Sequence, residues 1–403
     1  MSSIEFARFL QQVVGFPFGI HCSHVVGETM PRIILKLSVS YILPAKIKNG
    51  FKIYVVPVDN RGVASVCLMC AFFDDADEPL TLMRHLENDE DSGILRRALA
   101  RSKVLVHLFD EHNNELLGYR ATVLLPPLTK VRLASAKFPP LTHETANSIG
   151  EQANEWFSMR KASDDAEAIH IRFEESLYPH DVSIANAIER ADPGLHQEQD
   201  IVKLLQRVFQ PDQIYHSPRR HDDNKEIADV IVITDALVLV VQAKDSPNTE
   251  GSMNRLMERK RLAAVKMLKN AISQLSGAVR YIDRTDPLRM VVNGGEKSFN
   301  VRKHNVLSLA VVRELFNNDY AEYSEQLFGF FDEVGLPCIA LDYPELLRYT
   351  TFLKDEEAFV GAYLQVFDKA RELRTFPRLR FGINDAKAIF GDGGGVQEDP
   401  TRF

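Results

Sequence analysis

The chain has 403 residues, more than one typical domain, and its 45% hydrophobic and 26% charged residues are typical of globular proteins. The formal net charge of −8 argues against a protein that is held on nucleic acid mainly by its overall charge. No apolar run is long enough to span a bilayer, and no basic cluster precedes an apolar stretch near the N-terminus. We therefore expect two globular domains in a cytoplasmic protein without a membrane partner.

Residues 1–130 are expected to form a β-rich α+β domain. Segments rich in Val, Ile, Leu, Phe and Tyr, bounded by turn-forming residues, predict strands over residues 33–43, 51–58, 63–73, 104–110 and 115–125. Helices are expected over residues 4–14 and near 80–101. Cys67 and Cys70 have the spacing of a zinc motif, but they lie inside a predicted strand. Alternation sends them to opposite faces and disfavours a shared zinc ion.

Two further regions accompany the domains. Residues 131–190 contain Pro-rich and polar stretches, and we interpret them as a linker region with a helix over residues 143–161. Residues 381–403 contain a glycine-rich run and few apolar side chains, which predicts a tail that is flexible or docks on a partner.

Residues 191–380 alternate between helix and strand, so we expect an α/β domain. The spacing of apolar residues predicts helices over residues 197–209, 254–282, 320–333, 344–349 and 356–374. Strands are expected over residues 213–216, 227–234, 237–243, 304–312 and 337–341. The second and third of these strands are continuous apolar runs, as in strands covered on both faces. The first six elements follow the order α-β-β-β-α-β.

A predicted hairpin in this domain gathers three polar side chains. If residues 227–234 and 237–243 pair about the turn at Asp235 and Ala236, Asp229 lies opposite Gln242. Residues two apart on a strand share a face, and so do cross-strand partners. The hairpin therefore brings Asp229, Gln242 and Lys244 together at its open end.

These three groups suit the hydrolysis of a phosphodiester. The Asp229 carboxylate and the Gln242 carbonyl are oxygen ligands of the kind that Mg²⁺ or Mn²⁺ takes. Lys244 can orient the attacking water or neutralise charge on the phosphate. Because Gln adds no negative charge, a further acid is expected, and Glu198 on the preceding helix is the candidate. The alternative is that Asp229 and Lys244 form only a structural salt bridge at the end of a buried hairpin.

The arrangement resembles the PD-(D/E)xK phosphodiesterase superfamily, in particular the Mrr-like branch of restriction endonucleases, over roughly residues 191–352. The resemblance implies a restriction-endonuclease-like αβββαβ core. It also implies that Asp229 and Gln242 bind the metal ion, that Lys244 is catalytic and that Glu198 is the family's helix acid. Gln274 matches a glutamine that is common on the helix after the motif. The proline that usually precedes the aspartate is replaced by Ala228.

Basic residues are concentrated near this motif. Residues 251–290 contain nine bases against three acids, although the chain as a whole is acidic. We expect contacts with nucleic acid from Arg219, Arg220, Arg259, Lys260 and Gln274. The alternative is that these side chains form ordinary solvated faces.

The residues of the motif support a metal-dependent nuclease, and the leading hypothesis is a metal-dependent endodeoxyribonuclease. The family resemblance further implies the effector of a prokaryotic anti-phage defence or restriction system. An unselective DNase would damage its own cell, so we expect regulation by homo-oligomerisation or by a partner protein. The alternatives are an RNase or repair nuclease with the same site, a catalytically inactive module that binds DNA or protein, and a structural or adaptor protein. Cleavage specificity arises from surfaces around such a site and does not follow from the motif.

Overall fold

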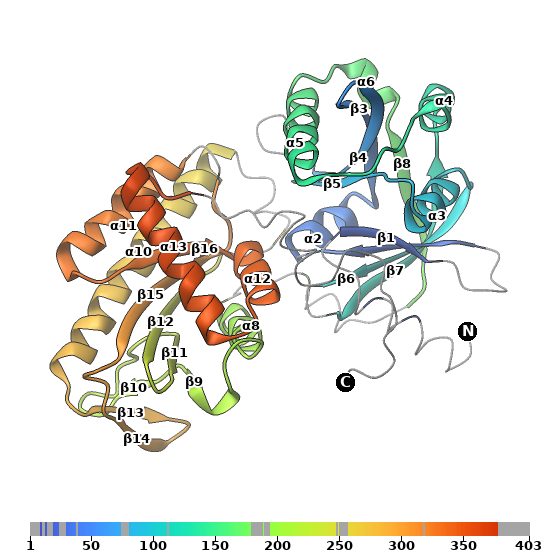
Figure 1. Cartoon of the computed structure of the whole chain (residues 1–403). Helices are drawn as coiled ribbons and strands as arrows, with labels where there is room; N and C mark the ends of the chain where they lie inside the picture. Colours follow the sequence, from blue (N-terminus) through green and yellow to red (C-terminus); the bar gives the residue numbers. More distant parts are fainter. Residues whose placement is uncertain are drawn as a thin grey trace, which may run out of the picture. The chain divides into compact units, whose positions relative to one another are not determined.

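The computed structural model describes residues 9, 13, 19–23, 30–37, 39–73, 80–110, 113–178, 188, 194–246, 249, 257–316 and 319–377. The chain is a mixed α/β protein with two compact units (Figure 1). Unit 1 comprises residues 1–190, 248–254 and 382–403, and unit 2 comprises residues 191–247 and 255–381. Apart from Phe9 and Val13, the helix expected over residues 4–14 lies outside the described residues, as does the tail over 381–403.

Unit 1 is built around one eight-stranded mixed sheet, in the order β1-β2-β6-β7-β8-β3-β4-β5. The strands are β1 Gly19–Ser23, β2 Arg32–Lys36, β3 Gly50–Asn60, β4 Val63–Phe73, β5 Leu80–His85, β6 Lys103–Phe109, β7 Glu115–Leu124 and β8 Ile169–Ser176. Residues 131–190, expected as a linker region, instead supply β8, which hydrogen-bonds to strands on both sides. The expected strand over 33–43 is also wrong in its second half, because β2 ends at Lys36 and a helix begins at Val39.

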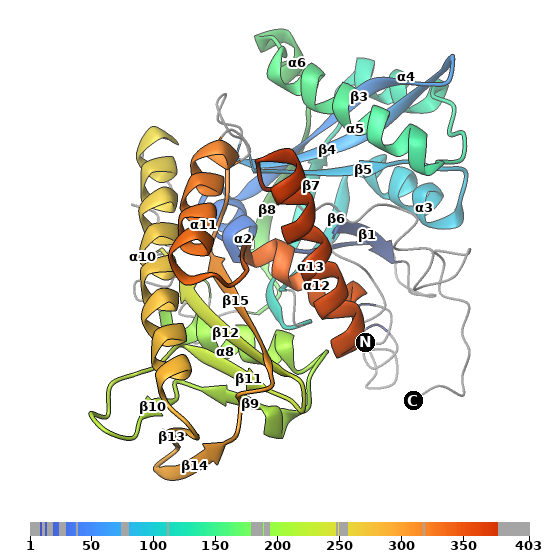
Figure 2. The same cartoon turned by 60° about the vertical axis from the view of Figure 1, so that its left-hand side comes forward.

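Helices cover both faces of this sheet (Figure 2). They are α2 Val39–Ile47, α3 Glu90–Leu99, α4 Pro127–Ser135, α5 His143–Ser158 and α6 Ala162–Ala166. The stretch expected to be helical over 80–101 is β5 followed by α3. Cys70 packs in the core that includes α2 and α3, whereas Cys67 packs in the core beneath α5. The two thiols therefore face opposite sides of the sheet, as the alternation along β4 predicted.

A side chain joins the two edge strands of the unit 1 sheet. Arg84 on β5 donates a hydrogen bond to the Ile20 carbonyl oxygen on β1 at 2.6 Å. The same guanidinium binds the Asp91 carboxylate on α3 at 2.5 Å. The sheet is thus curled enough for its first and last strands to meet through Arg84.

Unit 2 contains a five-stranded sheet in the order β16-β15-β12-β11-β9. Its strands are β9 Ile214–His216, β11 Val230–Ile233, β12 Leu237–Lys244, β15 Asn305–Val312 and β16 Cys338–Asp342. The β9–β11 and β11–β12 pairs are antiparallel, and the β12–β15 and β15–β16 pairs are parallel. Every residue from Leu237 to Ala243 is buried, as the apolar run predicted for a strand covered on both faces.

The helices of unit 2 pack on this sheet in two groups. They are α8 Gly194–Leu205, α10 Met257–Arg284, α11 Tyr320–Val334, α12 Tyr343–Phe352 and α13 Glu356–Leu373. The long helix α10 packs on β12, β15 and α11, and α8 packs on β9, β12 and α12. In chain order the elements α8, β9, β11, β12, α10 and β15 run α-β-β-β-α-β, with shorter elements between them. Among the described residues no helix is long and apolar enough to cross a membrane.

A small three-stranded sheet stands beside the main sheet of unit 2. It consists of β10 Arg219–Arg220, β13 Leu288–Val292 and β14 Gly295–Phe299. The sequence did not predict it, because β10 is two arginines long and most of β14 is polar and exposed. Tyr215 of β9 and Phe299 of β14 bring the two sheets together, with ring centroids 5.3 Å apart.

Replacing Tyr363 by Phe should destabilise unit 2. The hydroxyl of the fully buried Tyr363 lies 2.6 Å from the carbonyl oxygen of Ser308, within β15, and 2.9 Å from that of Pro337, the residue before β16. Loss of a buried donor should lower the free energy of unfolding by about 1–2 kcal/mol, measured by denaturant titration. Tyr281→Phe removes a longer, 3.2 Å bond to the Arg289 carbonyl oxygen and should cost less. An equal or larger loss in Tyr281→Phe would contradict this ranking.

Candidate active site

The hairpin of β11 and β12 has the register that its sequence predicts. Val230 pairs with Val241, and Ile233 pairs with Val238. One step beyond the last pair, Asp229 stands opposite Gln242 at the open end of the hairpin. The third strand, β9, continues the alignment, because His216 pairs with Val230 and the Ser217 N–H donates to the Asp229 carbonyl oxygen at 2.8 Å.

Asp229 is a buried carboxylate with a defined partner. Its side chain is only 4% exposed, and its Oδ2 accepts a hydrogen bond from the Ala243 backbone N–H at 2.6 Å. Burial raises the pKa of Asp229 to about 6, against the stabilising effects of the Ala243 N–H and of the Lys244 ammonium. The carboxylates of Glu198 and Glu226 raise the pKa of Asp229 further. The charges of Glu198, Glu226 and Lys244 therefore all influence the pKa of Asp229.

Gln242 and Lys244 lie at the end of the central strand β12. Gln242 is 3% exposed and Lys244 is half-buried. The strand is fixed on its other side by β15, where Lys244 pairs with Val312 and the Arg313 N–H donates to the Lys244 carbonyl oxygen at 3.2 Å. The Arg313 guanidinium then binds the Ser246 carbonyl oxygen at 2.8 Å. Arg313 thus holds the backbone at both Lys244 and Ser246.

Glu198 reaches the same end of the sheet from helix α8. Its Oε2 lies 2.9 Å from His216 Nε2 and 3.4 Å from the Ser217 hydroxyl, both at the end of β9. The preceding residue, Gln197, is buried with Ile201, and its buried Oε1 has no hydrogen-bond partner among the residues that the structure describes. The structure thus brings together all four predicted residues, Asp229, Gln242, Lys244 and Glu198.

Sequence reasoning missed several neighbours of these four residues. His216, Ser217, Glu226 and Arg313 flank the strand ends, yet each is an ordinary polar residue in the sequence. Only the pairing of the short strand β9 with β11 could have identified His216 and Ser217, and a three-residue strand carries too little pattern to fix that register.

The residues expected to contact nucleic acid are less tightly grouped. Arg220 lies over the Tyr281 ring at 4.9 Å and 3.7 Å from Asp223, whereas Arg219 is exposed. On α10, Arg259 is exposed and Lys260 is half-buried. Gln274 is exposed fifteen residues further along, about 22 Å at the helical rise of 1.5 Å per residue.

The first turns of α10 lie at the end of the sheet that carries Lys244. Arg261 of this helix makes a bidentate ion pair with Asp319, whose carboxylate lies 2.9 Å from Arg261 Nε. Asp319 follows the end of β15, and β15 runs parallel to β12. Arg259 and Lys260 therefore start from this end of the sheet, whereas Gln274 does not.

The oxygen donors at this site match the ligand preferences of Mg²⁺ and Mn²⁺. Asp229 keeps Oδ1 beside the Oδ2 that accepts the Ala243 N–H, and Glu198 and Gln242 add a carboxylate and a carbonyl oxygen. Within the part of the chain that the structure describes, no three His, Cys, Asp or Glu side chains are arranged as a ready-made metal cage. Mg²⁺ does not need one, because it keeps several waters and takes one or two carboxylates with substrate phosphate.

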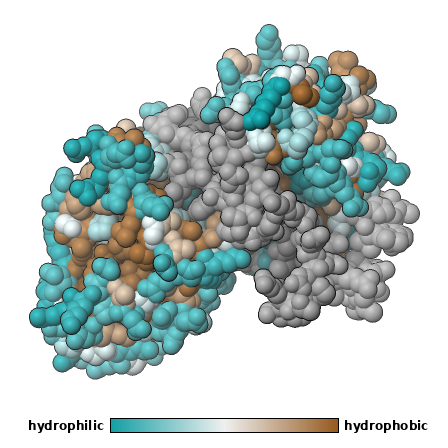
Figure 3. All heavy atoms as spheres, in the orientation of Figure 1, coloured by the Kyte–Doolittle hydropathy of each residue, from teal (hydrophilic) through white to brown (hydrophobic). Residues whose placement is uncertain are grey.

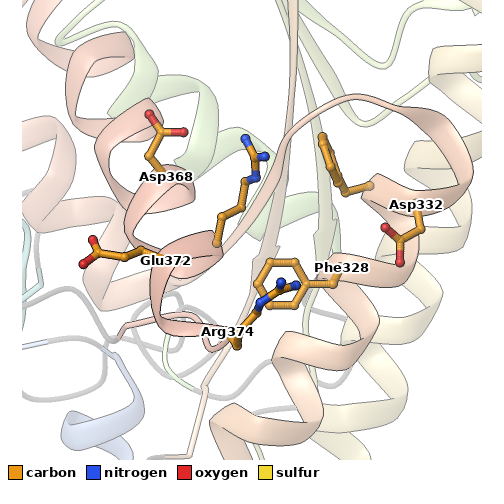
Figure 4. A pocket seen from close by; sticks show the side chains of 7 residues that line it. Phe328, Asp332, Asp368, Glu372 and Arg374 are labelled. Atoms are coloured by element: carbon orange, nitrogen blue, oxygen red, sulfur yellow. The ribbon is translucent and has the colours of Figure 1, made fainter.

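A hollow of about 530 Å³ lies elsewhere in unit 2, between α11 and α13 (Figure 4). Its lining mixes aromatic rings with charged side chains: Phe328, Phe331, Asp332, Asp368, Arg371, Glu372 and Arg374. In Figure 3, hydrophobic side chains gather on the face of unit 2 where these helices lie. None of the predicted site residues lines this hollow, so the chemistry suggested by the hairpin belongs to a different part of the unit.

Comparisons of the chain with protein-family models, curated proteins and solved structures find no significant match.

Asp229→Asn should stabilise the metal-free protein at pH 8 but not at pH 4. The folded-state pKa of Asp229, about 6, lies above its ordinary value of 3.8, so folding favours the protonated form. This contribution to stability is complete below pH 3.8 and is lost as the pH rises through 6. At about 1.4 kcal/mol per pKa unit, the variant should gain roughly 1–3 kcal/mol over wild type at pH 8. Denaturant titrations at both pH values measure this difference, and equal effects at pH 4 and pH 8 would contradict it.

Proposed function

We propose that the chain is a metal-dependent endonuclease that hydrolyses phosphodiester bonds of DNA. The observation that carries the proposal is the meeting of Asp229, Gln242 and Lys244 at the open end of one hairpin, with Glu198 of α8 beside them. Two carboxylates, a carboxamide and an ammonium group at one place are a donor set for a divalent cation and a phosphate together.

The proposed mechanism divides the work among these side chains. Asp229 and Glu198, with the Gln242 carbonyl, would hold Mg²⁺ or Mn²⁺, which supplies a Lewis acid and an activated water when bound. Lys244 donates hydrogen bonds to a phosphate oxygen or to the attacking water, and so offsets the negative charge that grows on the phosphorus centre. The buried ends of β11 and β12 exclude bulk water, which strengthens these interactions.

The electrostatics of the site agree with a need for a cation. The pKa of Asp229 is raised to about 6 mainly by burial, and the nearby carboxylates of Glu198 and Glu226 oppose its ionisation. A substrate phosphate would add more negative charge to this cluster. A divalent cation relieves both repulsions, whereas the single ammonium of Lys244 does not balance three carboxylates.

We further propose that unit 2 is a divergent PD-(D/E)xK domain of the Mrr-like type. The order α8, β9, β11, β12, α10, β15 and the mixed sheet with its motif at the strand ends support this assignment. Ala228 occupies the position before the aspartate where the family usually has proline, so the motif itself is atypical.

The proposed substrate contact lies along α10. No acid occurs between Glu258 and Asp283, and the side chains of Arg259, Lys266 and Lys269 are exposed. A helix face with several exposed bases and no acid, on a chain of net charge −8, is suited to a phosphate backbone. We include Arg219, Arg220, Lys260 and Gln274 as further contacts. RNA carries the same phosphates, so an RNase or a repair nuclease is the alternative that the substrate panel below distinguishes.

We propose the cellular role of a cytoplasmic effector in prokaryotic anti-phage defence or restriction, controlled by self-association or by a partner protein. The reason is the danger of an unrestrained DNase to its own genome. If the purified protein cuts DNA at full rate as a monomer without any partner, this control does not exist.

Cleavage should depend on the metal and on the four residues. Purified protein is incubated with supercoiled plasmid, linear duplex, single-stranded DNA and RNA in Mg²⁺ or Mn²⁺. Lys244→Ala and Asp229→Asn should each lower the cleavage rate at least about a hundredfold, since each removes charge stabilisation of the transition state. Lys203→Ala is the matched control, because Lys203 is an exposed α8 lysine paired with Asp200.

The pattern of loss decides between the alternatives. Cutting of RNA alone would replace the DNase by an RNase. Metal binding that is lost in Asp229→Asn, without cutting of any substrate, would indicate a module that has retained its metal ligands but lacks an activator. No metal binding and no cutting would contradict the proposal.

Reversing two charges on α10 should weaken DNA binding without changing the metal site. The double variant Lys266→Glu and Lys269→Glu should bind a DNA duplex at least about tenfold more weakly in Ca²⁺, and its affinity should depend less steeply on salt, by about two ion contacts. Lys369→Glu on α13, an exposed lysine paired with Glu372, is the matched control. An equal loss per reversed charge in both proteins would mean that only overall charge matters.

A further inference from the structure

We propose that His216 is a positioning residue that holds Glu198 in place as a metal ligand. The inference rests on the proposed function and extends it to a residue outside the motif. It assigns to β9, the shortest strand of the five-stranded sheet of unit 2, the role of fixing the side chain of a helix residue at the site.

The geometry of the contact defines the donor and the acceptor. His216 Nε2 lies 2.9 Å from Glu198 Oε2. An ionised carboxylate only accepts hydrogen bonds, so Nε2 must carry the hydrogen. The Ser217 hydroxyl lies 3.4 Å from the same oxygen and makes a weaker second contact. Both donors act on Oε2, so within the described part of the chain Oε1 of Glu198 remains available to a cation.

The backbone connects this contact directly to Asp229. His216 pairs with Val230, and the next residue, Ser217, donates its N–H to the Asp229 carbonyl oxygen at 2.8 Å. The imidazole that holds Glu198 is therefore attached to the strand that aligns Asp229.

Glu198 needs such a partner because the Asp229 carboxylate, which has the same charge, repels it. Its carboxylate acts on that of Asp229 with the same sign of charge, as does Glu226. A free glutamate side chain has several rotamers and would turn towards solvent to reduce this repulsion. The N–H of His216 holds the carboxylate near Asp229 while the cation is absent.

Stability alone does not account for the pair. The side chains of His216 and Glu198 are 34% and 21% exposed, and an ion pair at such partly exposed positions contributes little to folding. Replacing a histidine or carboxylate that orients a metal ligand, by contrast, typically lowers metal affinity or activity by about ten- to a hundredfold. The two roles therefore predict different measurements.

The experiment measures Mn²⁺ affinity by titration calorimetry on the full chain, together with the melting temperature. His216→Ala should weaken Mn²⁺ binding about tenfold or more and leave the melting temperature nearly unchanged. His216→Gln keeps an N–H donor and should restore much of the affinity. Removing both partners, in Glu198→Ala with His216→Ala, should cost no more than Glu198→Ala alone.

The matched control is His221→Ala. His221 is also a partly exposed histidine beside a carboxylate, with Nδ1 3.2 Å from Glu296 Oε1, but its pair joins β14 rather than α8. The His221→Ala variant should bind Mn²⁺ as tightly as the wild type does. Asp229-dependent Mn²⁺ binding that persists unchanged in His216→Ala would overturn this inference alone. A wild-type protein without Asp229-dependent Mn²⁺ binding would overturn the proposed function as well.

Discussion

The candidate site depends on one hydrogen bond, from the Ala243 backbone N–H to the Asp229 carboxylate. The N–H near the end of a buried central strand needs an acceptor, and a carboxylate supplies it where the strand pairing ends. This bond fixes a charged side chain between β11 and β12, and thereby sets Gln242 opposite it and Lys244 one alternation further along. The polar chemistry of unit 2 is therefore a consequence of how a buried hairpin terminates.

The buried position of Asp229, which the proposed function needs, lowers the stability of the folded protein when the carboxylate is ionised. A carboxylate that is 4% exposed and lies near two other acids is destabilising when ionised, and the Ala243 N–H and the Lys244 ammonium oppose that effect. The strands β11 and β12, which are buried from Val230 to Ile233 and from Leu237 to Ala243, supply the rigidity that keeps the group in place. Such conflicts between a local group and its surroundings are common at functional sites.

The hairpin and the positions of its three polar residues were predictable because they depend on short-range patterns, namely two apolar runs and the turn between them. Glu198 followed from helical spacing alone. The placement of β8 in the middle of the unit 1 sheet was not predictable, because its partners β3 and β7 are distant in sequence. Nor was β10, where two arginines form a strand only because β13 pairs with them. The contact of His216 with Glu198 could not be predicted for the same reason, since it depends on which strand β9 pairs with.

The Arg84 bridge in unit 1 has a consequence for how that unit can associate. Exposed edge strands invite other chains to extend a sheet, and proteins commonly protect them with charged side chains or by closure. Here the guanidinium of β5 occupies a carbonyl oxygen of β1 that an incoming strand would need. A strand that adds to this part of β1 would first have to displace the Arg84 guanidinium, which is also bound to Asp91. Arg84 thus helps to protect these two edge strands against edge-to-edge aggregation.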